Sequence, residues 1–290
     1  MGGTDAGGTA LPPPWLAGPA RFDVGLRPID PAGWLFPDDQ AASLPARAQL
    51  LRAVPDQVLR RLPGAQAAEA ELLALVRAAA AGAGVALPAA ASGDALVDAA
   101  LTVSDDLVLL APPGASGGAS GGGWQVRSIC LCAPTFFDAA HALGGDLARL
   151  HGPVPGGAPG LASRIGRVFD CLRPGQVLER HNWTVQWGAE RHTPSAAPWR
   201  AAAAAAPTGE AAAMLVERVE RQAIRKLPRT GWIIFTIRIR LTPLVQRLAS
   251  PDAAAAFAAA WAGSAPEVRD YKGWDLLERH VRHLLGPHQA

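Results

Sequence analysis

"GWIIFTIRIRL", residues 231–241, is the strongest strand signal in the chain. Because successive side chains of a strand point to opposite sides of a sheet, this stretch divides into two faces of different character. Arg238 and Arg240 fall on the face that begins with Trp232. The other face is apolar and consists of Ile233, Phe235, Ile237, Ile239 and Leu241. The alternation predicts that the fold is organised around a sheet.

A second strand is predicted at "ERHNWTVQW", residues 179–187, but neither of its faces is plainly apolar. Such polar side chains face either water, as on the outer surface of a half-buried sheet, or a ligand pocket. The alternation alone leaves both interpretations open. One face carries Glu179, His181, Trp183, Val185 and Trp187, and the other carries Leu178, Arg180, Asn182, Thr184 and Gln186.

Helical spacing of apolar residues precedes and follows the predicted strands. Residues 1–20 are rich in Gly, Pro and Ala, which predicts a poorly ordered N-terminal segment, and residues 21–290 are predicted to form a single domain. The pattern favours an α+β fold with a mainly antiparallel sheet flanked by N-terminal and C-terminal helices. Further strands are predicted at 105–113 and 123–134, and helices at 41–62, 66–80, 136–150, 160–172, 211–227, 251–262 and 266–285.

The composition excludes several classes of protein. The 290 residues are 49% hydrophobic and 18% charged, with a formal net charge of +2, which is too small to indicate a nucleic-acid surface. No stretch approaches the ~20 apolar residues that span a bilayer, and the N-terminus lacks the pattern of a secretory signal. We therefore expect a soluble cytoplasmic protein with neither nucleic acid nor membrane as a partner.

The three cysteines are too few for an all-cysteine iron–sulfur cluster, which takes four thiolates. Cys130, Cys132 and Cys171 are also an odd and sparse set for a disulfide framework, so buried free thiols are predicted. The sequence contains no dinucleotide fingerprint, phosphate loop or covalent heme motif. The familiar local motifs therefore assign no activity.

Three longer stretches, taken together, resemble a known family. "LHGPVPG" (150–156), "ERHNWTV" (179–185) and "RVERQAIRKLPRTGWIIFTIRIRLTPL" (218–244) resemble the signature blocks of the heme-dependent oxidative N-demethylase alpha-subunit-like family. "FDVGLRPIDPAGWLFPDD" (22–39), "VSDDLVLL" (103–110) and "YKGW" (271–274) fit its flanking pattern in the same order. The resemblance extends from about Phe22 to Leu285.

The resemblance implies a PAS-like, metal-binding heme domain that binds heme b. It implies an oxidoreductase of the monooxygenase type in amine metabolism, which uses dioxygen to demethylate a small secondary amine and releases formaldehyde. FMN, a [2Fe-2S] cluster and tetrahydrofolate are expected only in partner subunits, with a flavin/iron–sulfur NADPH-dependent reductase as the electron source. Two alternatives remain, namely a non-catalytic heme-PAS oxygen or redox sensor and a heme-free PAS-like binding module.

A non-covalent heme usually takes one strong axial donor, for which neutral histidine is the common choice. We predict His151 as the iron ligand, because it follows a helix and Pro153 and Pro155 stiffen the backbone behind it. The alternative is that His151 caps the preceding helix. His181 is the second candidate. We expect His280, His283 and His288 to be solvated surface groups.

Other side chains are candidates for the surroundings of the heme. Arg180, Asn182 and Arg238 are predicted donors to dioxygen or to a heme propionate, with a solvent-facing sheet surface as the alternative. Asp106 and Glu220 are candidate carboxylates for a cationic amine, although Glu220 is also predicted to hold a neighbouring strand from a helix. Trp183 and Tyr271 complete the predicted heme-binding set. Tyr271 lies in "YKGW", where it either packs in the core or directs Lys272 toward an acidic neighbour or a propionate.

Overall fold

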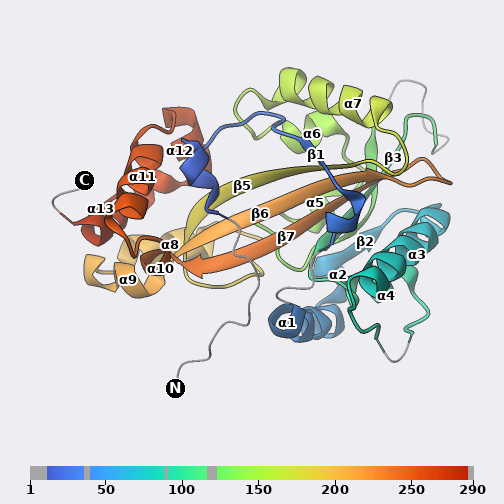
Figure 1. Cartoon of the computed structure of the whole chain (residues 1–290), viewed down its shortest axis with the longest axis horizontal. Helices are drawn as coiled ribbons and strands as arrows, with labels where there is room; N and C mark the ends of the chain where they lie inside the picture. Colours follow the sequence, from blue (N-terminus) through green and yellow to red (C-terminus); the bar gives the residue numbers. More distant parts are fainter. Residues whose placement is uncertain (1–11, 36–39, 89–90, 116–122, 287–290) are drawn as a thin grey trace.

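The computed structural model describes residues 12–35, 40–88, 91–115 and 123–286. Within these ranges one seven-stranded sheet runs through the molecule in the order β1-β5-β6-β7-β3-β4-β2 (Figure 1). Every neighbouring pair of strands is antiparallel, which confirms the predicted α+β class and the antiparallel sheet. The strands are β1 (Arg27–Ile29), β2 (Leu59–Arg61), β3 (Asp106–Ala111), β4 (Gln125–Cys130), β5 (Val177–Trp187), β6 (Leu215–Lys226) and β7 (Ile233–Pro243).

The helices lie in three groups around the sheet (Figure 1). The first group lies on one side and contains α1 (Gln40–Ala53), α2 (Pro55–Val58), α3 (Gln66–Gly82) and α4 (Ala95–Ala100). The second covers the other side and contains α5 (Ala139–Ala142), α6 (Leu147–His151) and α7 (Ala162–Cys171). The third surrounds one end of the long strands and contains α8 (Ala197–Ala205), α9 (Ala211–Met214), α10 (Leu244–Arg247), α11 (Pro251–Ala262), α12 (Pro266–Lys272) and α13 (Glu278–Leu285). In the described ranges no helix combines the length and apolar character that crossing a membrane requires.

The helix predicted at 211–227 is wrong for most of its length. Only α9 is helical, and β6 begins at Leu215 and pairs along its whole length with β5 and β7. Glu217 and Arg221 are four residues apart, a spacing that suits a surface pair on a helix, but both side chains are buried and contact other elements. A strand buried on both faces does not show apolar–polar alternation, because its charged residues find partners inside the protein.

Two other predicted helices are shorter than expected. The helix predicted at 41–62 ends at Ala53, and Leu59–Arg61 instead pairs with β4. The helix predicted at 136–150 is interrupted at Gly144, whose φ of +75° favours glycine. There the backbone turns to pair with Val126 on β4. Both breaks add backbone hydrogen bonds to the sheet that a continuous helix could not make.

The N-terminal segment contributes to the core from Pro14 onward. A 3₁₀ turn, η1 (Pro14–Ala17), places Trp15 with 1% of its surface exposed, and its indole N–H donates to Glu217 Oε1 at 2.6 Å. This contact differs from the loose segment predicted over 1–20, of which residues 1–11 lie outside the described ranges. The Gly, Pro and Ala residues around Trp15 favour a flexible segment, but the buried indole and its hydrogen bond hold the segment against the core.

The two faces of the sheet pack against different helices. The α7 face is the side on which Leu178, Ile224 and Phe235 join the hydrophobic cluster of α5–α7. The α3 face is the opposite side, where Val177, Ala223 and Ile234 join the cluster of α3 and α4. From the register, the α7 face includes Arg180, Asn182, Gln222, Glu220 and Ile237, and the α3 face includes Glu179, His181, Arg221 and Arg238.

Candidate functional site

A row of half-buried polar residues lies in the middle of the α7 face. Asn182 is the cross-strand partner of Glu220, and Arg180 is the partner of Gln222. All four are intermediate in exposure, whereas Gln186, farther along the same face, is fully buried. We call these four residues the central polar row. They are too buried for an ordinary solvent face and too exposed for the core.

Neutral donors hold the carboxylate of Glu220 in place. Its Oε2 accepts from Asn182 Nδ2 at 3.3 Å and from Gln222 Nε2 at 2.8 Å, and its Oε1 accepts from the Thr135 hydroxyl. Thr135 in turn accepts from Arg218 Nε at 2.8 Å. The carboxylate is therefore oriented by its neighbours, and no cation binds it directly among the described residues.

Two cations flank this carboxylate at a longer range. Arg180 donates to the backbone carbonyls of Asp23 (2.6 Å) and Val24 (3.4 Å), and no ion pair of Arg180 occurs in the described part of the chain. Burial lowers the pKa of the Arg180 guanidinium, and the charge of Glu220 opposes that shift. Lys272 donates from Nζ to Asn182 Oδ1 at 3.1 Å. Together with Lys272, the row thus carries two cationic groups and one carboxylate, which suits an anionic group.

His151 ends α6 on the same side of the sheet. Its Nδ1 lies 2.8 Å from the Leu147 carbonyl, and because a carbonyl only accepts, Nδ1 carries the proton. The lone pair is then on Nε2, as a metal-binding imidazole requires. Burial lowers the pKa of His151, and the charge of Arg180 lowers it further, so the neutral form is favoured.

A tight turn fixes the backbone that follows His151. The Val154 amide donates to the His151 carbonyl at 3.0 Å, and the Gly157 amide donates to the Val154 carbonyl at 2.7 Å. A Cβ at Gly157 would collide with the His151 carbonyl oxygen, so only glycine fits there. The predicted helix cap at His151 is also present, since the ring bonds a carbonyl of its own helix.

His181 lies on the opposite, α3 face. Its Nδ1 is 3.9 Å from Glu179 Oε1, and Glu179 also accepts from Arg221 Nε at 2.5 Å. Burial lowers the pKa of His181 as well, and its Nε2 is buried without a hydrogen-bond partner among the described residues. The structure therefore separates the two candidate ligands, and Arg180 accompanies His151.

Tyr271 and Trp183 differ in their relation to the central polar row. Burial raises the pKa of the Tyr271 hydroxyl, and so does the charge of Glu220, which places Tyr271 near the row. Its ring packs edge-to-face on Phe22 at 5.0 Å. Trp183 instead packs on Trp274 at 4.9 Å in the C-terminal cluster, so it supports the strand from the α3 face.

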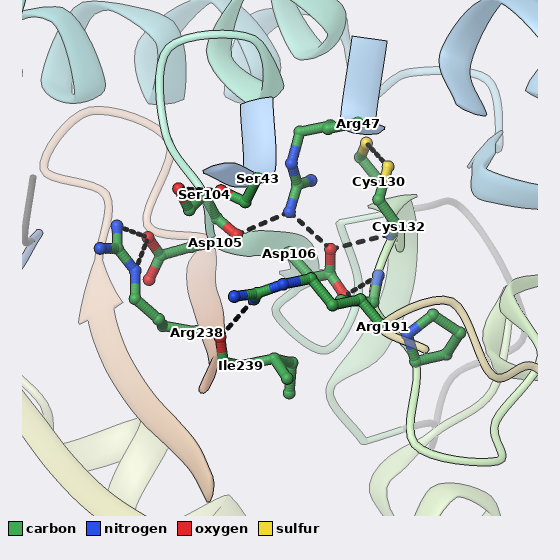
Figure 2. A network of polar contacts seen from close by, with 12 residues as sticks. Ser43, Arg47, Ser104, Asp105, Asp106, Cys130, Cys132, Arg191, Arg238 and Ile239 are labelled. Carbon is green, nitrogen blue, oxygen red and sulfur yellow. Dashed lines mark hydrogen bonds and ion pairs between the residues drawn. The ribbon is translucent and has the colours of Figure 1, made fainter. Parts of the chain in front are cut away.

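Asp106 and Arg238, predicted as site residues, are held in buried ion pairs (Figure 2). Asp106 accepts from Arg47 Nη2 at 2.9 Å and from the amides of Cys132 and Ala133, and it is fully buried. Arg238 donates to Asp105 Oδ2 at 2.6 Å and is equally buried. Their charges are used inside the protein, and this placement removes both from the candidate site.

Lys272 is the residue whose importance the sequence patterns underestimated. Its ammonium donates to the Trp183 carbonyl at 2.8 Å as well as to Asn182, and the expected acidic neighbour is Glu220. The missed signal is compositional: only two of the 27 basic residues of the chain are lysines, Lys226 and Lys272. A lysine buried in a chain that otherwise uses arginine indicates a specific role.

Two predictions about other polar residues need correction. His280 is fully buried, not solvated, with Nε2 2.9 Å from the Ala203 carbonyl, while His288 lies outside the described ranges. Cys130 and Cys132 are buried free thiols as predicted, but Cys171 is exposed. The described residues contain no cluster of three or more His, Cys, Asp and Glu that could hold a metal ion. A heme iron usually takes a single donor from the protein, and His151 and His181 are the two candidates for it.

Comparison with known protein families identifies one family. No curated protein matches the chain. The sequence profile of one family, described as haem-dependent oxidative N-demethylase, alpha subunit-like, matches residues 76–282, a range that holds β3–β7 and every residue of the central polar row. The chain belongs to this alpha-subunit-like family of haem-dependent oxidative N-demethylases.

Proposed function

We propose that the chain is the heme b-binding subunit of an oxidative N-demethylase that acts on a small secondary amine and releases formaldehyde. The observation that carries this proposal is His151. Its Nδ1 is committed to the Leu147 carbonyl, its Nε2 holds the lone pair, and Arg180 on the same face favours the neutral ring. The family name supports the heme dependence and the reaction class.

The residues of the α7 face fit a heme in two further respects. Leu178, Phe235 and Ile237 are half-buried apolar side chains beside the central polar row, as the flat macrocycle needs. Arg180 would supply positive charge for a propionate or for the reacting dioxygen. Heme b would supply the iron that activates dioxygen at this face.

The remaining residues of the row then have separate roles. Glu220 is the carboxylate that holds the protonated amine, because its three donors fix its direction. Asn182 donates to Glu220 and accepts from Lys272, and therefore keeps the two charges apart. Tyr271 is 43% exposed and so does not pack in the core; it lies near enough to Glu220 to feel its charge.

We infer a PAS-like arrangement for the sheet and helices, in one heme-binding domain over residues 21–290, acting in the cytoplasm. The reducing equivalents come from a flavin/iron–sulfur NADPH-dependent reductase with FMN, a [2Fe-2S] cluster and tetrahydrofolate in the partner subunits. The family name, which designates one subunit of a larger enzyme, supports this division. Three cysteines cannot ligate an all-cysteine cluster, which agrees with it.

Heme titration of the protein and two histidine variants tests the ligand. The wild-type protein should bind about one heme per chain and show a Soret band. His151→Ala should lose most of that heme or bind it weakly with a changed spectrum, whereas His181→Ala, the matched control, should keep it. Circular dichroism of both variants establishes that they are folded. If only His181→Ala loses heme, the ligand is His181 and the assignment of His151 is wrong. A colourless wild-type protein would refute heme binding.

Formaldehyde release separates the enzyme from the alternative heme-PAS sensor. The chain alone with NADPH should turn over little or no amine, and addition of a flavin/iron–sulfur reductase should release formaldehyde. Robust NADPH-driven turnover by the isolated chain would contradict the proposed division between subunits. A protein that binds heme but releases no formaldehyde with any competent reductase favours the sensor.

A further inference from the structure

Lys272 is the more deeply buried of the chain's two lysines. Its residue exposure is 8%, and it ends α12 beside the central polar row. Lys226, at the end of β6, is more exposed; its Nζ donates to the Asp170 carbonyl at 3.3 Å and lies over the Trp124 ring at 5.6 Å. An arginine cannot lose its proton in a protein, whereas a buried lysine can. The use of lysine at this buried position therefore permits chemistry that arginine does not.

The hydrogen bonds of Lys272 are compatible with a neutral amine. Nζ donates to Asn182 Oδ1 at 3.1 Å and to the Trp183 carbonyl at 2.8 Å. A neutral primary amine has two N–H groups and one lone pair, so these two acceptors use both N–H groups. When the ammonium loses its third proton, both hydrogen bonds remain. The lone pair then points in the tetrahedral direction that this proton occupied.

The surroundings of Nζ favour the neutral form. Burial lowers the pKa of Lys272 from 10.5 to about 8, while the Phe22 and Trp274 rings, 5.6 Å and 5.8 Å from Nζ, make cation–π contacts that act in the opposite direction. The charge of Arg180 on β5 adds to this shift, while Glu220 on β6 opposes it. At pH 7.5 about a quarter of such amines are neutral, compared with ~0.1% of ordinary lysines.

We propose that Lys272 is a nucleophilic amine that captures a small aldehyde as a reversible imine, and that the aldehyde is the formaldehyde released at this site. The identity of the aldehyde rests on the proposed function, whereas the reactivity of the amine does not. Desolvated lysines beside another cation are a recognised class of imine-forming nucleophile. Arg180 is that second cation.

The reaction is balanced without an oxidant or a reductant. The Nζ lone pair attacks the formaldehyde carbon, the C=O π electrons move to oxygen, and a proton passes from nitrogen to that oxygen to give a carbinolamine. The C–O bond then breaks as the oxygen leaves with a second proton as water, and the Lys272 N=CH₂ bond forms. Addition of water reverses both steps and returns formaldehyde.

Reductive trapping on the full chain tests this proposal without the demethylation reaction. The protein, with and without heme, is treated at pH 7.5 with ¹³C-formaldehyde and cyanoborohydride, which converts an imine into a stable N-methyl group, and peptide mass spectrometry compares the two lysines. Lys272 should be methylated at least ~10-fold faster than Lys226, because its larger neutral fraction outweighs its poorer access. In guanidinium chloride the ratio should fall to about one.

Equal or slower methylation of Lys272 in the folded protein would overturn the proposal. Because the measurement uses the wild-type chain, it does not depend on a variant that folds. Lys272→Arg keeps the cation and should remove the rapid phase, while Lys226→Arg should leave it. A protein that binds no heme but still methylates Lys272 selectively would refute the proposed function and retain the reactive amine, so the two failures are distinguishable.

Discussion

Asn182 and Glu220 face each other directly across β5 and β6, and the Asn182 amide joins a cation to an anion. Its Nδ2 donates to Glu220 Oε2 at 3.3 Å while its Oδ1 accepts from Lys272 at 3.1 Å. The lysine thereby determines which end of the amide faces the carboxylate, since an ammonium only donates. The orientation of Glu220 depends on this contact.

Glu220→Gln tests whether that carboxylate holds the amine. An amide has one acceptor oxygen for three donors and no charge for a cationic substrate. We expect kcat/KM for amine demethylation to fall roughly 10-fold to 100-fold with the heme spectrum unchanged. The double variant Glu220→Gln/Gln222→Glu restores a carboxylate to the row at the neighbouring position. If the direction of the carboxylate matters, this second change should not restore kcat/KM. Unchanged kcat/KM in Glu220→Gln would assign the residue to structure alone.

Arg180→Ala tests the fixed positive charge of the site. The variant should keep heme at near-normal occupancy, because His151 is untouched, but demethylation should fall ~10²–10³-fold, the scale seen when one preorganised donor is removed. Arg27→Ala is the matched control, since Arg27 contacts Glu179 on the α3 face and its side chain is largely exposed. An equal effect of the two variants would indicate a general loss of stability.

Gly157→Ala tests the turn that fixes His151. The added Cβ would meet the His151 carbonyl, so the turn must shift and the imidazole with it. We expect faster transfer of heme to an acceptor such as apomyoglobin. Gly160→Ala is the control, because a Cβ there has no heavy atom within 4 Å. Identical transfer rates in the two variants would show that the turn does not position the ligand.

Arg238→Met tests the reassignment of Arg238 to the core. Removing it leaves the fully buried Asp105 without its ionic partner, which typically costs 3–5 kcal/mol, so the free energy of unfolding in urea should fall by about that amount. Arg282→Met removes an exposed pair with Glu278 and should cost under ~1 kcal/mol. A loss of heme from folded Arg238→Met with no change in stability would return Arg238 to the site.

Lys272 should make stability depend on pH in the alkaline range. Its pKa is lowered from 10.5 to about 8 in the folded protein, so the unfolded chain binds more protons between these values and stability rises with pH there. Between pH 7 and 9.5 the wild type should gain about 2 kcal/mol relative to Lys272→Met. Urea unfolding at the two pH values measures this difference. A gain near zero would mean that Lys272 is not desolvated.

The sequence predicted the longer strands that alternate and missed β6, which does not, together with the short edge strands β1 and β2. β7 was found because apolar residues recur at every second position on one face, and β5 because Trp183, Val185 and Trp187 alternate with polar residues. β6 was predicted as a helix because Glu217, Arg218, Glu220 and Arg221 resemble a charged helical surface, whereas in the fold their partners come from distant elements. Trp15, more than 200 residues away in sequence, is one such partner of Glu217.

The candidate site was predictable to a similar degree. His151, Arg180 and Asn182 lie on the α7 side, and "HGPVP" and the alternation of β5 are local signals that pointed to them. Glu220 and Tyr271 lie near them, but they were proposed only from blocks of the family resemblance. Asp106, Arg238 and Trp183 lie elsewhere, since whether a charged residue meets a ligand or a buried partner depends on tertiary contacts that no local pattern records. Asp105 beside Asp106 provides an example, as each aspartate binds a different arginine.

The bond from Lys272 to the Trp183 carbonyl also has a consequence for self-association. β1 pairs with only Val177–Glu179, so within the described ranges the rest of the outer edge of β5 has no neighbouring strand. An open edge of this length is a template on which a second chain can add a strand. Lys272 occupies one of its backbone acceptors, and the Trp274 indole beside it donates to the Thr184 hydroxyl at 2.9 Å. The C-terminal segment therefore hinders the pairing of a second chain with the edge of β5.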